Sequence, residues 1–301
     1  MSFSKVVIEK MAYALPPQIV SSDELETQLE PLYQKVNLQV GRLELMTGIK
    51  ERRFWGNGYR ASEASAEAGK KLLQDGTINP QEVDLLIHSA VCRDRLEPAT
   101  ASYVHKLMGL GDNTQILDVS NACLGFLNAL ILAGSMIEQG AIKRAIIVAG
   151  ENGKPLVDQT IDILNGANMD RKSIKPYFAN LTIGAGAVAW SITCDDSSSS
   201  EKPRLAQFAS STDTSHNHLC EGDQSVGGMV MQTDSEELLH AGISVAKKAW
   251  NKFLEVTHWS AEKPDLIVTH QVGKAHQQEI EKALSYDPSK SFTTFQSLGN
   301  C

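Results

Sequence analysis

The chain has 301 residues, of which 42% are hydrophobic, and this length can bury a large core as two ordinary domains or one duplicated unit. Its net charge of −8 gives no reason to expect a nucleic-acid partner, because proteins that bind nucleic acids carry clustered positive charge. Glycines and polar residues interrupt the longest apolar stretch, at 124–137, which is typical of a buried helix and argues against a membrane span. The N-terminus lacks the regions of a signal peptide, so we expect a cytoplasmic protein.

The first half of the chain alternates helices with apolar strands. The predicted elements are a strand at 6–8, a helix at 61–73, a strand at 84–90, a strand followed by a long helix within 116–140, and strands at 145–149 and 187–193. Between 151 and 180 the periodicity is poor, so we expect an irregular insertion there.

The second half repeats the order of the first. A helix-like stretch at 241–254 leads through Lys263 and Pro264 into an Asp-aliphatic strand at 265–271. Residues 296–300 are predicted to end a further strand. The recurrence predicts a duplicated α/β fold whose two mostly parallel sheets share a central helical layer.

A polar, turn-rich run separates the two halves. We therefore expect an N-terminal half at 1–194, a linker at 195–203 and a C-terminal half at 204–301. The first half continues for 70 residues from Cys123 to Thr193, whereas one residue follows Asn300. We expect a truncated C-terminal end that lacks a helix and two strands.

The five cysteines are odd in number and widely spaced, and they include no C-x-x-C pair. They are Cys92, Cys123, Cys194, Cys220 and Cys301. This pattern argues against a disulfide framework, so we expect reduced thiols.

Cys123 stands where a β-branched strand ends and a long apolar helix begins. Unpaired N–H groups and aligned peptide dipoles at a helix N-terminus stabilise a thiolate, which would make this residue a nucleophile. The alternative is a small buried apolar residue, the usual role of a free cysteine. His270 and Asn300, each at the end of a predicted strand, favour the catalytic role, because the three side chains provide a nucleophile, a base and an orienting amide.

Five segments resemble, in order, motifs of the thiolase superfamily, in its ketoacyl synthase III-like branch. They are M-T-G-I-K-E-R-R at 46–53, D-V-S-N-A-C-L-G at 118–125, I-G-A-G-A-V-A-W at 183–190, H-Q at 270–271 and L-G-N at 298–300. The resemblance covers essentially the whole chain. It implies a five-layered α-β-α-β-α fold, a homodimer, and a catalytic site made of Cys123, His270 and Asn300.

The segments V-C-R-D-R-L-E-P-A-T at 91–100 and T-H-Q-V-G at 269–273 resemble the OleA-type branch, whose members join two fatty acyl chains head to head. The resemblance implies an acyltransferase that condenses two long-chain fatty acyl-CoA thioesters, without decarboxylation, to a 2-alkyl-3-oxoacyl product in olefinic hydrocarbon biosynthesis. It also implies that Glu97 reaches across the dimer into the partner's site. There it would remove the proton next to the carbonyl of the second acyl group. The alternative for Glu97 is an ordinary surface glutamate before a proline.

Two other functions stay open at this point. A decarboxylating 3-oxoacyl-[acyl-carrier-protein] synthase III would obtain its enolate from a malonyl substrate and would not need Glu97 as a base. A non-catalytic thiolase-fold subunit would leave Cys123 unacylated. No cofactor is expected besides coenzyme A as part of the substrate, and the acyl group could arrive on coenzyme A or on a carrier protein.

The residues that contact coenzyme A are not assigned. Arg42 and Met46 stand where ordinary synthase III enzymes carry a tryptophan and an arginine that hold coenzyme A. Arg52 and Arg53 either lie near the pantetheine entrance or form structural ion pairs. The acyl channels should be aliphatic. Three apolar residues after the nucleophile, Leu124, Phe126 and Leu127, either line such a channel or belong to the core.

Other histidines suggest weaker sites. His88 occupies the first-half position that corresponds to His270, and we expect a packed strand residue. His216, His218 and Cys220 alternate, so on a strand they would share a face as zinc ligands do. The sequence offers no fourth ligand, and we assign no metal site.

Overall fold

The computed structural model describes residues 2–301 apart from 167–168, 196, 198–200 and 226–227. Its chain divides into two units. The first contains Met1–Pro16, Trp55–Asn152 and Gly186–Phe208, and the second contains Pro17–Phe54, Gly153–Ala185 and Ala209–Cys301. The predicted halves, 1–194 and 204–301, stay a prediction. Of the predicted linker at 195–203, residues 196 and 198–200 lie outside the described residues.

A five-stranded mixed sheet forms the centre of the first unit, with the strand order β1-β7-β6-β4-β5. The strands are β1 (Val6–Ala14), β4 (Leu85–His88), β5 (Gln115–Asp118), β6 (Arg144–Asn152) and β7 (Ala185–Cys194). Strand β4 pairs in parallel with β5 and β6, whereas β1 is antiparallel to β7. All of β4 is buried, which explains its three consecutive apolar residues, Leu85, Leu86 and Ile87, because a strand covered on both faces does not alternate. The predicted strands of the first half are thus confirmed.

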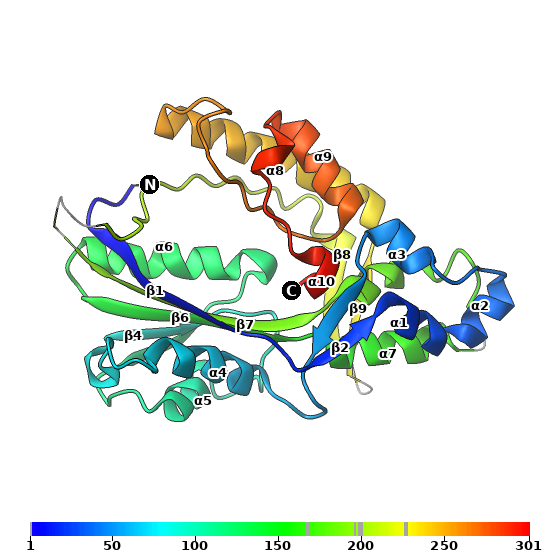
Figure 1. The fold of residues 1–301 in the computed structure, drawn as a ribbon, viewed down its shortest axis with the longest axis horizontal. Coiled ribbons are helices and arrows are strands. Elements are labelled where there is room, and N and C mark those ends of the chain that lie inside the picture. Colours follow the sequence, from blue (N-terminus) through cyan, green and yellow to red (C-terminus); the bar gives the residue numbers. More distant parts are fainter. Residues whose placement is uncertain (1, 167–168, 196, 198–200, 226–227) are drawn as a thin grey trace. The chain divides into compact units, whose positions relative to one another are not determined.

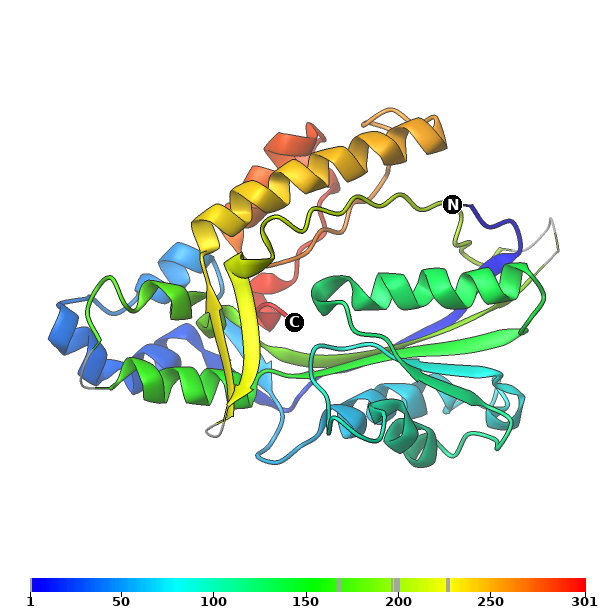
Figure 2. The same ribbon diagram turned by 180° about the vertical axis from the view of Figure 1, so that it is seen from behind.

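Helices cover both faces of this sheet (Figures 1 and 2). Helix α6 (Gly125–Glu138) lies on one face, and α4 (Ala61–Leu73) and α5 (Thr100–Met108) lie on the other. The core between α6 and the sheet includes Ala129, Leu130, Ala133 and Ile137 of the helix with Leu85, Ile87 and Ile147 of the strands. The helical residues recur every three or four positions and so form one apolar stripe. Helix α4 has the bounds that the alanine-rich sequence predicts.

The second unit contains two small antiparallel sheets and most of the remaining helices. Strand β2 (Gln18–Ser21) pairs with β3 (Glu51–Phe54), and β8 (Cys220–Ser225) pairs with β9 (Gly228–Thr233). The helices are α1 (Ser22–Gln28), α2 (Glu30–Val36), α3 (Arg42–Thr47), α7 (Lys154–Leu164), α8 (Ser235–Thr257), α9 (Lys274–Leu284) and α10 (Phe295–Leu298). Helix α8 contains the predicted helix at 241–254 and contacts α9, while α7 contacts β9.

Two strands predicted in the second half are not formed. Within 265–271 Ile267 makes an isolated bridge, to Ser291, and residues Phe295–Leu298 form the short helix α10. Asn300 takes part in an isolated parallel bridge with Ile183. The reason is that β-branched composition does not make a strand unless a neighbouring strand accepts and donates hydrogen bonds along several residues.

The prediction of an irregular insertion between 151 and 180 is also wrong for most of this segment. Helix α7 occupies Lys154–Leu164, with a proline in its first turn, where its missing N–H costs nothing. A 3-10 helix follows at Lys175–Thr182. The buried residues of α7 are Leu156, Val157, Thr160, Ile161 and Leu164, a helical spacing that the sequence contains.

The candidate zinc residues do not alternate on one strand. A 3-10 turn at Asn217–Leu219 separates His216 from β8, which begins at Cys220. Among the described residues, no three side chains of the metal-ligating types gather in one place.

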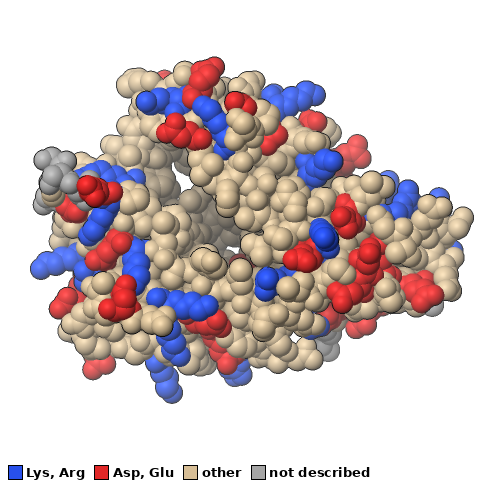
Figure 3. All heavy atoms as spheres, in the orientation of Figure 1, with Lys and Arg blue, Asp and Glu red and all other residues tan. Residues whose placement is uncertain are grey.

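Acidic and basic side chains are interspersed over the face of the molecule in Figure 3. In the described part of the chain, no helix combines the length and the apolar composition that crossing a membrane requires. The predicted cytoplasmic location and the predicted lack of a nucleic-acid partner stay predictions.

Candidate active site

Cys123 lies in a short 3-10 turn, Ala122–Leu124, between the end of β5 and the start of α6. This is the position that the sequence predicts. All five cysteines are thiols, and Cys123 is exposed, so it is not a small buried core residue. The first-turn N–H groups of the 14-residue helix α6 carry partial positive charge, which favours a thiolate just before the helix.

The residue before the thiol has an unusual backbone conformation. Ala122 has a φ of +44°, in the left-handed region, which costs a residue with a side chain about 1 kcal/mol. Hydrogen bonds hold the turn, among them one from the amide of Gly125 to the carbonyl of Ala122. The amide of Leu124 donates to the carbonyl of Asn121 over 3.0 Å, and the Asn121 side chain donates to Asn128 Oδ1 over 2.6 Å. Sharp, strained turns of this kind cluster at functional sites.

Helix α6 approaches the end of β4 closely because its first residue is a glycine. A Cβ at Gly125 would lie 2.6 Å from Ser89 Oγ. That hydroxyl donates a 3.0 Å hydrogen bond to the carbonyl of Val119 in the segment after β5. The glycine therefore lets the end of β4, the segment after β5 and the helix meet just behind Cys123.

Three apolar residues follow the thiol within four positions of the chain. Leu124 is 56% exposed and Leu127 is 51% exposed, so the alternative that they belong to the core is wrong for both. Phe126 packs on the core, edge to face with Trp190 at a centroid distance of 5.4 Å. Two exposed leucines thus lie within four residues of Cys123 in the chain.

Glu97 lies on the loop between β4 and α5, which we call the 91–99 loop, and its side chain is exposed. Its neighbour Leu96 is 86% exposed. The apolar surroundings expected for this carboxylate are therefore not supplied by its own loop. Both residues are exposed in the middle of the 91–99 loop.

His88 is a buried strand residue, as the sequence predicts, and is 1% exposed. Its Nδ1 lies 3.9 Å from a carboxylate oxygen of Asp118. Burial lowers the pKa of His88, and the nearby carboxylate opposes this shift only in part. His88 is therefore neutral near pH 7 and belongs to the interior of the sheet.

In the second unit, His270 and the residues on either side of Asn300 line one pocket of about 170 Å³. The lining residues are Thr269, His270, Gln271, Thr294, Leu298, Gly299 and Cys301. The side chain of His270 is exposed at this pocket, and desolvation by nearby protein atoms still lowers its pKa. A neutral imidazole can donate one N–H to a ligand. The structure thus brings the predicted His270 and the Asn300 segment together in the second unit, while Cys123 and Glu97 belong to the first.

The side chain of Gln271 joins the segment that carries His270 to the segment 292–295 by hydrogen bonds. Its Oε1 accepts hydrogen bonds from the amides of Thr294, at 2.5 Å, and Phe295, at 3.0 Å. The same side chain donates to the carbonyl of Phe292 over 3.2 Å. Sequence reasoning used the H-Q pair only as a motif. Its glutamine has a structural role, because it fixes the loop that leads to Asn300.

Arg52 lies behind the Asn300 segment and is completely buried. A Cβ at Gly299 would lie 3.0 Å from the Cβ of Arg52. The guanidinium donates to Ser22 Oγ and to the carbonyl of Leu181, both over 3.1 Å, and burial lowers its pKa to about 10. A position near the pantetheine entrance is therefore wrong for Arg52. Among the described residues no carboxylate lies within ion-pair distance of it, so the ion-pair alternative is wrong as well.

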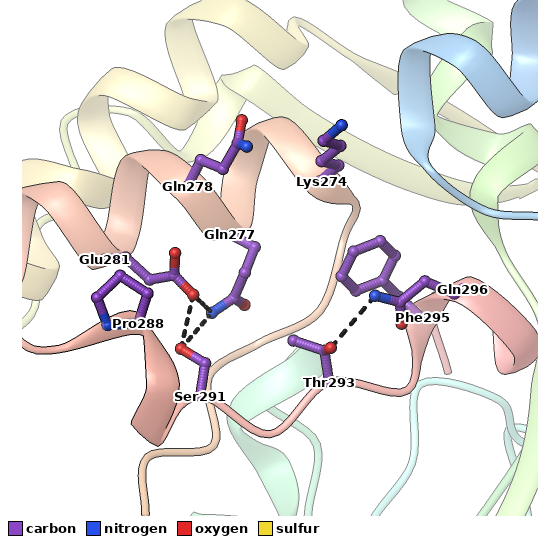
Figure 4. Close-up of a pocket in the computed structure, with 9 residues that line it drawn as sticks. All are labelled: Lys274, Gln277, Gln278, Glu281, Pro288, Ser291, Thr293, Phe295 and Gln296. Atoms are coloured by element: carbon purple, nitrogen blue, oxygen red, sulfur yellow. Dashed lines mark hydrogen bonds between the residues drawn. The ribbon is translucent and has the colours of Figure 1, made fainter.

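A second groove, of about 230 Å³, lies between α9 and the segment 288–296 (Figure 4). Gln277 and Ser291 both donate hydrogen bonds to the carboxylate of Glu281, over 2.8 and 2.6 Å. This polar network joins α9 to the segment that precedes α10. None of the residues that the sequence nominates as catalytic lines this groove.

Comparison with known proteins identifies the class. Residues 117–213, which include Cys123, match the family model of 3-oxoacyl-[acyl-carrier-protein] synthase III. An acyl-CoA:acyl-CoA alkyltransferase of Shewanella oneidensis is 38% identical over 308 residues, covering 100% of this chain and 88% of the relative. A protein of the same name from Xanthomonas campestris pv. campestris is 33% identical over 300 residues, covering 100% and 87%.

A solved structure supports the same class. The crystal structure of Xanthomonas campestris OleA, with one cysteine replaced by serine and with bound lauric acid and lauroyl-CoA, is similar with a TM-score of 0.92. The sequence identity is 32%, and the match covers 99% of this chain and 87% of that one. The predicted α/β thiolase fold is thereby confirmed.

Fold and matches together define a ketoacyl synthase III-like acyltransferase of the thiolase superfamily. Within this class, the chain belongs to the acyl-CoA:acyl-CoA alkyltransferase family, the OleA type. The family supports condensation of two acyl groups over both alternatives that the sequence left open.

Proposed function

We propose that this chain catalyses the non-decarboxylative Claisen condensation of two long-chain fatty acyl-CoA thioesters to a 2-alkyl-3-oxoacyl product. The observation that carries the proposal is the exposed thiol of Cys123 in the turn before α6, in a chain of this family. The exposed side chains of Leu124 and Leu127, near Cys123 in the chain, suit an alkyl chain. The Xanthomonas relative with bound lauroyl-CoA supports coenzyme A as the carrier of the acyl group.

In the first half-reaction the Cys123 thiolate attacks the carbonyl carbon of one thioester. A bond forms between that carbon and the cysteine sulfur, and the bond to the coenzyme A sulfur breaks. Coenzyme A leaves as a thiolate and takes a proton from solvent. The acyl-cysteine divides one difficult reaction into two easier ones.

In the second half-reaction Glu97 removes a proton from the carbon next to the carbonyl of the second acyl-CoA. Charge develops on the carbonyl oxygen of the enolate, and His270 and Asn300 donate hydrogen bonds to it. The enolate carbon attacks the acyl-cysteine, a carbon–carbon bond forms, and the Cys123 thiolate leaves. Glu97 then loses its proton to solvent. Hydrolysis of the product thioester would give the free 2-alkyl-3-oxoacid.

Glu97 acts, in this proposal, in the site of a second copy of the chain. The exposed middle of the 91–99 loop, with Leu96 next to Glu97 in the chain, supports this arrangement. The edge strand β5 also leaves Ile116 and Leu117 38% and 39% exposed. An apolar sheet edge favours pairing with another chain, so a homodimer would cover it. The reaction needs no resident cofactor, because the thioester itself is the activated group.

The test supplies the purified protein with a long-chain acyl-CoA as its sole substrate. A 3-oxoacid, or the ketone that forms from it, is expected without any malonyl donor. The Glu97→Ala variant should still acylate Cys123 but fail to condense, and the Cys123→Ala variant should do neither. Product that appears only with a malonyl thioester would instead support the decarboxylating synthase that the family model describes. An unacylated Cys123 would support a non-catalytic subunit.

A further inference from the structure

We propose that Glu151 is a positioning residue, which fixes the 91–99 loop so that Glu97 is presented correctly for the second half-reaction. The inference rests on the proposed function of Glu97. Glu151 lies near the end of β6 and does not belong to the motifs that the sequence singled out. The signal that was overlooked is an acidic side chain directly after the apolar run A-I-I-V-A-G in a central strand.

The carboxylate of Glu151 binds the beginning of the loop. Its Oε1 accepts a 2.7 Å hydrogen bond from the amide of Val91, and its Oε2 accepts a 3.1 Å bond from the amide of Cys92. One carboxylate therefore satisfies two consecutive backbone donors. Because both bonds end on one buried side chain, they fix the start of the loop to β6.

The strand that carries Glu151 is itself well supported. The indole of Trp55 donates a 3.1 Å hydrogen bond to the carbonyl of Glu151. The amide of Asn152 donates to the Cys92 sulfur over 3.4 Å, and that thiol donates to the carbonyl of Asn152 over 3.6 Å. Burial, followed by the nearby Glu151 carboxylate, raises the pKa of Cys92, so its thiol stays protonated. The loop start is thus held by both the side chain and the backbone of β6.

Two more carboxylates hold the loop farther along. Asp94 accepts hydrogen bonds from the amide of Ser62, at 3.0 Å, and from its hydroxyl, at 2.5 Å. Asp118 accepts bonds from the amides of Thr100, at 2.7 Å, and Ala101, at 2.8 Å, where α5 begins. These contacts leave the residues from 95 to 99 between anchors, with Glu97 in the middle. The conformation of residues 95–99 therefore depends on how the residues before and after them are held.

Replacing one carboxylate oxygen of Glu151 should disturb its hydrogen bonds to the loop. Desolvation raises the pKa of Glu151, while the Cys92 side chain and the two backbone donors oppose the shift. In Glu151→Gln one of the two oxygens becomes an NH₂ group, which cannot accept a hydrogen bond and would face a backbone N–H. The substitution keeps the shape of the side chain but breaks one anchor. The neighbouring loop residues would then move relative to the anchor at Asp94.

The same arrangement elsewhere in the first unit provides a matched control. Glu138, near the end of α6, accepts hydrogen bonds from the consecutive amides of Ser4 and Lys5, at 3.0–3.1 Å, and from the Ser4 hydroxyl, at 2.5 Å. Glu138→Gln therefore replaces one acceptor oxygen of a similar carboxylate-to-backbone contact, at the end of α6 remote from Cys123. It does not touch the 91–99 loop.

The experiment compares both variants in the full-length protein with a long-chain acyl-CoA. In Glu151→Gln, acylation of Cys123 should stay within about twofold of the wild type, and condensation should fall about tenfold or more, because small misplacements of reacting groups are costly. Amide hydrogen exchange in residues 91–96 should be faster. Glu138→Gln should change neither rate. Glu151→Asp, which keeps two acceptor oxygens, should recover part of the lost condensation, and it replaces the glutamine variant if that variant does not fold.

The outcomes separate the two proposals. Condensation at the wild-type rate in Glu151→Gln, while Glu97→Ala has lost it, overturns the positioning role and leaves the proposed function intact. Condensation in Glu97→Ala overturns the proposed role of Glu97 instead. Equal loss of acylation and condensation in Glu151→Gln also overturns the positioning role, since it indicates general damage to the fold.

Discussion

The carbonyl of Asn300 accepts a 2.9 Å hydrogen bond from the amide of Gly184, and its own amide donates a 2.8 Å bond to the carbonyl of Thr182. These bonds fasten the last pocket-lining segment to the I-G-A-G segment of the chain. The contact is possible because position 184 has no side chain. A Cβ there would lie 2.2 Å from the carbonyl oxygen of Leu298.

Gly184→Ala should therefore displace the Asn300 segment. We expect a loss of about 1–3 kcal/mol in the free energy of unfolding, the usual cost of overpacking, together with strongly reduced condensation. Gly186→Ala is the control, because the nearest atom to a Cβ at that position is 4.0 Å away. Denaturant unfolding and product formation are the measurements. Equal behaviour of the two variants would contradict the steric argument.

The pH dependence of the site follows from the lowered pKa of His270. An ordinary histidine titrates near pH 6.5, so the His270 resonance should titrate below this value in NMR. The unfolded chain binds this proton more readily than the folded one. Stability contributed by the group is therefore present above about pH 6.5 and is lost as the pH falls through the folded-state pKa.

The control for this prediction is His276, whose ring packs edge to face on His270 at a centroid distance of 5.9 Å. Because desolvation is the cause of the shift in His270, His276→Asn should leave its midpoint below the ordinary value. A midpoint at or above pH 6.5 in the wild type would be incompatible with the desolvated pocket.

Arg52 should matter for stability, since it is completely buried between Ser22 and the carbonyl of Leu181. Arg52→Ala removes two hydrogen bonds and leaves a cavity, so we expect a loss of about 2–4 kcal/mol in the free energy of unfolding. Arg42→Ala, at an exposed position, should change it by less than about 0.5 kcal/mol. Similar losses in chemical denaturation of the two variants would refute the structural role of Arg52.

Thiol labelling distinguishes Cys123 from Cys92. Iodoacetamide reacts with thiolates, and the pKa of Cys92 is raised by burial, whereas Cys123 is exposed before a helix. We expect Cys123 to be alkylated at least about tenfold faster, and prior incubation with a long-chain acyl-CoA to protect it. Peptide mass spectrometry measures both rates. If the rates are equal, Cys123 is not an activated nucleophile.

The first sheet and two of its helices, α4 and α6, could be predicted because each of these elements carries its own periodicity, whereas α5 was not predicted. The alanines of 61–73 and the apolar run at 84–90 specify α4 and β4 without reference to distant residues. Helix α7 was equally readable, and its buried positions Leu156, Val157 and Ile161 have the spacing that poor overall periodicity obscured. The local pattern of apolar residues is sufficient to predict an element that packs through a single apolar stripe.

The candidate site was less predictable. The nomination of His270 and Asn300 relied on two strands that do not form, yet their segments meet in one pocket. They meet because the Gln271 side chain bonds the amides of Thr294 and Phe295, a contact between residues more than 20 positions apart. A side chain that binds distant backbone leaves no periodic signal. The anchoring role of Glu151 was missed for the same reason.

The left-handed backbone at Ala122 limits how the enzyme can be re-engineered for other chain lengths. Glycine, asparagine and aspartate accept this conformation, whereas valine, isoleucine and threonine do not. In a saturation library that spans the nucleophile turn, many substitutions at position 122 would therefore disturb the turn. Randomising Leu127 instead, an exposed residue of α6 beyond the turn, would vary the apolar surface and leave the turn that presents the thiol untouched.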